Sequence, residues 1–63
     1  MFRNPYITVE LKKILDRPKA ILVLTKQDKE VWLPKKLITI TREWDEYVRF
    51  EIPENIAIQK GIN

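Results

Sequence analysis

The chain has 63 residues, of which 44% are hydrophobic and 33% are charged, and its formal net charge is +3. A chain of this length buries only about 60% of the surface that its unfolded form exposes, so it can form one small domain, residues 1–63, with a core dense in large side chains. It has no cysteine and no histidine. Their absence excludes disulfides, thiolate metal sites and the commonest general base, so we expect no enzyme and no bound metal or cofactor.

Residues 6–15 alternate between apolar and polar side chains, which predicts a half-buried strand. The alternation slips after Leu11, because the next apolar residue, Ile14, follows three positions later. Either a β-bulge re-aims the strand or the segment is helical, since its apolar residues also fit helical spacing. We favour the strand because the run Ile-Thr-Val is β-branched throughout.

Residues 19–26 contain the uninterrupted apolar run Ala-Ile-Leu-Val-Leu, which is typical of a strand that is covered on both faces. Residues 30–33 form the next predicted strand, which ends at Pro34 because proline lacks the N–H that a sheet ladder needs. The polar connections at residues 16–18 and 27–29 are short enough for hairpins. We therefore expect three antiparallel strands in sequence order.

Two further strands are predicted at residues 37–41 and 47–52, separated by a charged connection at residues 42–46 that holds Trp44. The last strand alternates without interruption. Its expected inward-facing residues are Val48, Phe50 and Ile52.

Residues 53–62 begin with Pro-Glu and end with Lys-Gly-Ile, which predicts a short helix that holds its shape by docking on the sheet. Five short strands and this helix predict an all-β fold. A strongly bent sheet of this size is expected to close into a small SH3-like or OB-like barrel, which would leave no free edge.

Three stretches of the chain carry a resemblance. They are Lys-Ala-Ile-Leu-Val at residues 19–23, Lys-Glu-Val-Trp-Leu-Pro-Lys at residues 29–35, and Ile-Pro-Glu at residues 52–54 followed by Ala57 and Lys-Gly-Ile at residues 60–62. This pattern resembles a group of small, uncharacterised phage-type and prophage-type proteins. It departs from them at Lys36, where the group has a serine, and at Asn55, where it has an aromatic residue.

The resemblance implies a viral or mobile-element origin and a compact β module. It favours either nucleic-acid handling or inhibition of a host factor, and it assigns no role to any residue. A weaker resemblance, to the carbon-storage-regulator family of RNA-binding proteins, rests on residues 21–26, 38–41, 47–49 and 56–58. That family has glycines after its first strand, which this chain lacks, and we interpret this second resemblance as a coincidence of strand patterning.

Trp32, in the run Val-Trp-Leu-Pro-Lys-Lys, is the most informative candidate for a binding residue. An aromatic ring beside lysines can stack on a base while the ammonium groups contact phosphates, although a tryptophan in a short strand can equally belong to the core. Arg49 shares the outward face of the last strand with Tyr47, and its alternative role is a cross-strand pair with an acid. The residues predicted to bind DNA or RNA are Lys12, Lys13, Trp32, Lys35, Lys36, Tyr47 and Arg49.

Basic residues form three short clusters, and a hairpin tip together with a turn could bring two of them to one end of a barrel, as a footprint for phosphates. The same lysines could instead guard strand edges against aggregation. The three clusters are Lys12 with Lys13, Arg17 with Lys19, and Lys35 with Lys36.

Trp44 stands between charged residues, so it is either a lid on the core or an exposed anchor for a partner. The acids beside it disfavour phosphate and favour a protein partner. The alternative function is therefore protein–protein interaction through Trp44, as a viral accessory protein that inhibits a host factor or as a homodimeric or larger structural subunit.

Apolar runs in the chain are all shorter than a signal peptide or the roughly 20 residues that span a bilayer. We therefore expect no membrane association and a cytoplasmic location, in the host cell if the protein is viral.

Overall fold

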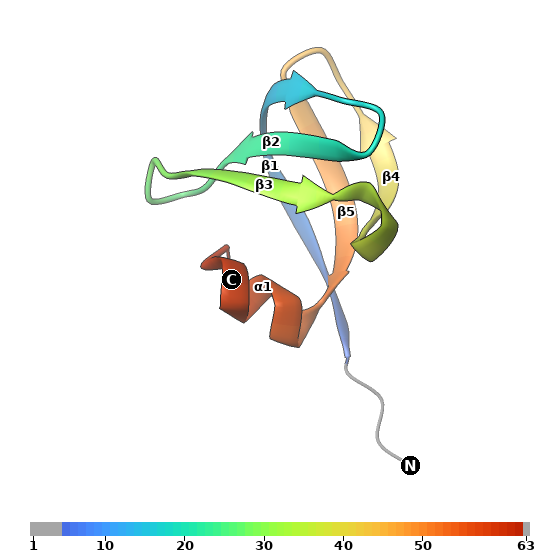
Figure 1. Cartoon of the computed structure of the whole chain (residues 1–63), viewed down its shortest axis with the longest axis vertical. Coiled ribbons are helices and arrows are strands. Elements are labelled where there is room, and N and C mark those ends of the chain that lie inside the picture. The colour runs from blue at the N-terminus through green and yellow to red at the C-terminus, as the bar shows by residue number, and fades with distance from the viewer. Residues whose placement is uncertain (1–4, 63) are drawn as a thin grey trace.

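The computed structural model describes residues 5–62. Residues 1–4 and 63 lie outside this range, so the first residues of the stretch in which the sequence predicts no signal peptide are not described. The described chain is mostly β, with one antiparallel five-stranded sheet followed by a short helix (Figure 1). The elements are β1 (Tyr6–Asp16), β2 (Ala20–Leu24), β3 (Glu30–Pro34), the 3₁₀ turn η1 (Lys35–Leu37), β4 (Thr39–Glu43), β5 (Tyr47–Pro53) and α1 (Glu54–Lys60). The five predicted strands and the terminal helix are confirmed.

The strand order is β3-β2-β1-β5-β4, with every neighbouring pair antiparallel. The first three strands follow one another through hairpins, as predicted. β1 is the central and longest strand, and it belongs to both halves of the sheet. One half consists of β1, β2 and β3, and the other consists of β1, β5 and β4. The first part of β1, as far as Lys12, pairs with β5, and its last part, from Lys12 onward, pairs with β2.

A β-bulge interrupts β1 between Lys13 and Leu15, which confirms the bulged strand and shows that the helical alternative was wrong. Ile14 is the extra residue. In a regular strand Leu15, four positions after the buried Leu11, would lie on the same face as Leu11, whereas the bulge brings Leu15 opposite Leu22 on the other face. The bulge therefore re-aims the end of β1, as bulges in bent sheets do.

The core lies between the two halves of the sheet. In Figure 1, β2 and β3 run across β1 and β5. The inward-facing side chains of both halves form one cluster, in which alternate residues of β5 are fully buried, as the sequence predicted. The largest side chains without solvent exposure are Ile21, Val23 and Leu33 from the β2–β3 hairpin and Val48, Phe50 and Ile52 from β5.

Closure of the sheet into a barrel is not confirmed, because β3 and β4 are its two edges and do not pair within residues 5–62. The SH3-like or OB-like type is likewise not confirmed. The predicted connection at residues 42–46 was too long. Arg42 and Glu43 belong to β4, and the Trp44 N–H closes a tight hairpin by donating to the Tyr47 carbonyl at 2.8 Å.

Helix α1 begins directly after Pro53 and ends at Gly61, which adopts the left-handed conformation with φ 73°. Two backbone bonds close its end: the Gly61 N–H donates to the Ile58 carbonyl at 3.1 Å, and the Ile62 N–H donates to the Ala57 carbonyl at 3.0 Å. These are the bonds of a Schellman motif, and Ala57 and Ile62 are both buried in the core cluster. No helix within residues 5–62 is long and apolar enough to cross a membrane.

Candidate functional site

An open pocket lies where the β1–β2 connection meets the end of β3. Pro18 and Pro34 form part of its wall together with Lys19, Lys35 and Lys36, and its volume is about 670 Å³. The Lys35 N–H donates to the Lys19 carbonyl at 2.9 Å and so joins η1 to the β1–β2 connection. We call this site the basic pocket.

Positive charges outnumber negative charges at the basic pocket. Four basic residues line the pocket or lie in the adjoining β1–β2 connection, and within residues 5–62 the one ion pair that any of them forms with an acid joins Lys35 to Asp16. The excess of three charges equals the formal net charge of the whole chain, so the other basic and acidic residues balance. The four basic residues are Arg17, Lys19, Lys35 and Lys36.

The ion pair fixes one of these lysines. Lys35 donates a hydrogen bond from Nζ to Oδ1 of Asp16. This bond, assisted by the positive charges of Lys35 and Lys13, holds the pKa of the Asp16 carboxyl below its usual value. Asp16 therefore stays ionised at neutral pH and orients Lys35, while Lys19 and Lys36 have no acidic partner within residues 5–62.

Trp32 lies beside the basic pocket on the outer face of β3. It pairs with Leu22, which pairs in turn with Leu15, so these three side chains form a row across the sheet. Trp32 is 44% exposed and Leu15 is 42% exposed, and between them Leu22 is almost covered. Trp32 therefore does not belong to the core. We call this group the apolar row.

The apolar row and the basic pocket are contiguous. Trp32 and Pro34 are two residues apart on β3, so their side chains share one face at a spacing of roughly 7 Å. An exposed indole ring and two unpaired ammonium groups thus lie next to one another, which is the combination that stacks a base and contacts its phosphate.

Two other predicted binding residues, Tyr47 and Arg49, lie on the outer face of the β1–β5 half. Lys12 pairs with both Tyr47 and Leu24, so it lies where the outer faces of the two halves join. The inner faces of the two halves pack against each other, so their outer faces point in different directions. Tyr47 and Arg49 therefore do not extend the basic pocket, and Lys12 does not line it.

Lys13 does not line the pocket and is engaged within the chain. It donates a hydrogen bond from Nζ to Oε2 of Glu43 at 2.6 Å, which raises the pKa of the Lys13 ammonium above its usual value. Its charge is balanced by this partner.

Two arginine side chains lie over the Trp44 ring. The guanidinium carbon of Arg42 lies 5.0 Å from the centroid of the Trp44 ring, and that of Arg49 lies 5.3 Å from it. Arg49 also donates to Oε1 of Glu10 at 3.1 Å, which is the cross-strand pair named as its alternative role. We call these four residues the Trp44 cluster.

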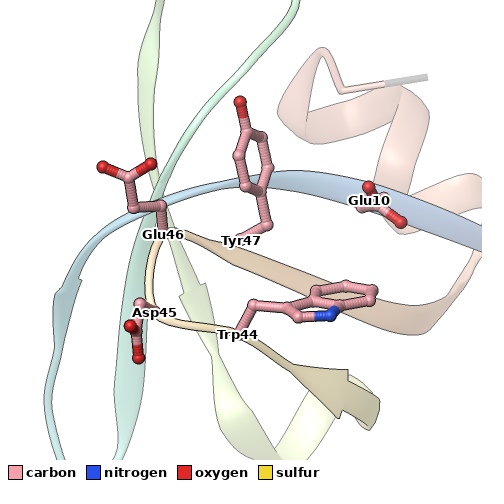
Figure 2. Close-up of a pocket in the computed structure, with 5 residues that line it drawn as sticks. All are labelled: Glu10, Trp44, Asp45, Glu46 and Tyr47. Atoms are coloured by element: carbon pink, nitrogen blue, oxygen red, sulfur yellow. The ribbon is translucent and has the colours of Figure 1, made fainter.

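Beside the Trp44 cluster lies a shallow pocket of about 420 Å³, lined by Glu10, Trp44, Asp45, Glu46 and Tyr47 (Figure 2). In Figure 2 the Asp45 and Glu46 side chains point away from the Trp44 ring. The ring is only partly exposed and stands outside the core cluster. It is thus neither a core lid nor a fully exposed anchor.

Two of the three basic clusters in the sequence meet at the basic pocket, those of Arg17 with Lys19 and of Lys35 with Lys36. Sequence reasoning singled out the first cluster but did not include it among the binding residues, and it took Pro18 and Pro34 only as strand ends. The signal that could have identified the pocket was the predicted β2–β3 hairpin, because it brings residue 19 next to residue 35.

No protein family model matches this chain, and neither a curated protein nor a solved structure matches it. The resemblance to phage-type proteins therefore stays a prediction. Within residues 5–62, no group of three or more histidine, cysteine, aspartate or glutamate residues is placed to hold a metal ion.

Proposed function

We propose that this protein is a non-catalytic module that binds nucleic acid through the basic pocket and Trp32. The observation that carries the proposal is a local excess of positive charge: three basic residues without an ion pair among the described residues lie at one end of the β2–β3 hairpin, beside an exposed indole ring. We further infer that the bent sheet is an open variant of the small SH3-like or OB-like barrel.

The size of the site sets the expected affinity and its salt dependence. Each neutralised phosphate contributes a slope of about −0.7 to −0.9 to the dependence of log K on log salt concentration. Three contacts therefore weaken binding roughly 20- to 40-fold between about 50 and 200 mM salt. One stacked ring contributes about 1–3 kcal/mol.

The experiment is a titration of labelled single-stranded and double-stranded DNA and RNA, followed by fluorescence anisotropy at several salt concentrations. Lys36→Gln should weaken binding and reduce the salt slope by about one contact. Lys29→Gln is the matched control, because Lys29 is also an exposed lysine but lies at the opposite end of the same hairpin. It should leave both quantities nearly unchanged.

Absence of binding at low salt would contradict the proposal, as would an equal effect of the two lysine variants. The former result would favour the alternative function, protein–protein interaction. The exposed apolar row would then be the first surface to test for a partner, since the Trp44 cluster is engaged within the chain.

A further inference from the structure

The basic pocket has apolar walls as well as positive charges, whereas a phosphate alone would need only the charges. Pro18 and Pro34 present saturated rings to the pocket, and the ammonium groups of Lys19 and Lys36 have no acidic partner among the described residues. A volume of about 670 Å³ lies in the usual range for small-molecule sites, which combine apolar walls with a few polar groups. These features fit a flat base attached to a phosphate.

The distance between the pocket and Trp32 restricts the form of the nucleic acid. The two sites are separated by roughly 7 Å along β3, whereas stacked bases follow one another at about 3.4 Å along each strand of a duplex. Neighbouring bases of a duplex therefore cannot occupy both sites. A single strand can do so, because its bases can be splayed apart and each can meet a separate surface.

We propose that this surface binds single-stranded nucleic acid as two consecutive, unstacked nucleotides. One base stacks on Trp32 and the next enters between Pro18 and Pro34, while the linking phosphate contacts Lys19 and Lys36. The inference rests on the proposed function and adds to it a strand preference, a second base subsite and a minimal footprint.

Three probes test the inference: a single strand of about six nucleotides, an abasic strand of the same length that keeps the same phosphates, and a duplex of the same sequence, which carries about twice the phosphate charge. The single strand should bind at least about tenfold more tightly than the abasic strand, because two base contacts are lost in the latter. It should also bind more tightly than the duplex.

Variants locate the two subsites. Trp32→Ala and Pro18→Ala should each weaken binding of the normal single strand and leave binding of the abasic strand nearly unchanged. Tyr47→Ala is the matched control for Trp32, because Tyr47 is an aromatic residue with similar exposure, 46% against 44%, on the other outer surface. It should affect neither probe.

Equal binding of the normal and abasic strands, or tighter binding of the duplex, would overturn the inference while leaving the proposed function in place. A loss of binding in Tyr47→Ala alone would also overturn it, since the bases would then lie on the other surface. If no probe binds, the proposed function itself fails. The probe comparison uses the unmodified protein, so it stands even if one of the variants is destabilised.

Discussion

Trp44 shows how one extra residue in a strand changes the surroundings of a side chain. A bulge between Ile40 and Arg42 leaves Thr41 without a residue opposite it on β5 and brings Arg42 directly opposite Arg49. Like charges in such positions repel each other. The negative charge of Glu10 and the π face of Trp44 offset this repulsion, which gives the ring a structural role in keeping the two strands paired.

Replacement of Trp44 by alanine is therefore expected to lower the free energy of unfolding by about 1–3 kcal/mol. Two cation–π contacts at partly exposed positions contribute about 0.5–1 kcal/mol each, and the buried part of the ring adds to them. Urea denaturation measures the change. Nucleic-acid affinity should stay within about twofold, because the ring lies away from the basic pocket.

Trp32→Ala is the paired control and should behave in the opposite way. Its ring is 44% exposed, so its loss should cost less stability than the loss of Trp44 while single-strand binding falls. If Trp44→Ala abolishes single-strand binding with the fold intact, the assignment of the two tryptophans is reversed, and Trp44 is the ring that stacks on the base.

The C-terminal end of helix α1 depends on the left-handed conformation of Gly61. A Cβ added at Gly61 would meet no atom within 4 Å, so the cost of a side chain there is the backbone conformation alone. Gly61→Ala should lower the free energy of unfolding by about 1–2 kcal/mol. Gly61→Asn should cost less, because asparagine tolerates this region better.

Thermal denaturation can resolve this difference, since about 1 kcal/mol shifts the Tm of a domain of this size by about 4–8 °C. Gln59→Ala, an exposed position of the same helix, is the control and should change Tm little. A Gly61→Ala protein as stable as this control would mean that the Schellman motif does not hold α1 on the core.

Elements with a local signal were the ones that the sequence predicted well. β5 follows from strict alternation, α1 from its Pro-Glu start and Lys-Gly end, and the bulge in β1 from the slip at Ile14. The end of β4 was placed too early, because the bulge at Thr41 breaks the alternation and makes Arg42 and Glu43 resemble a loop.

Features that join distant residues could not be predicted in the same way. Lys13 and Glu43 are 30 positions apart, and Asp16 and Lys35 are 19 apart, so no local pattern relates them. Barrel closure depends on how β3 and β4 meet, which is decided by the bend of the whole sheet. The basic pocket likewise exists only once β2 and β3 have paired.

The stability of the protein should change little across the neutral pH range, because the chain has no histidine and histidine is the side chain that normally titrates there. The pKa of Asp16 is lowered by its bond from Lys35. Its contribution is therefore present above the unfolded value of about 3.9 and is lost as pH falls through the lower folded value.

Lys13 affects the pH dependence of stability at high pH. Its pKa is raised by the bond to Glu43, so its contribution is present below the unfolded value of about 10.4 and is lost as pH rises through the higher folded value. Urea denaturation should therefore show a plateau between about pH 5 and 9, with losses below about 4 and above about 10. Asp16→Asn should reduce the acid loss, and a transition within the plateau would contradict this account.

The position of β1 at the centre of the sheet also has a consequence for protein synthesis. β1 ends at Asp16, but β5, which pairs along its first half, does not begin until Tyr47. At roughly 5–20 residues per second, a ribosome needs on the order of seconds to make the segment between them. During that interval the chain can form at most the β1–β2–β3 part of the sheet, and the first half of β1 has no strand to pair with. Completion of the fold must therefore wait for the last quarter of this sequence to be translated.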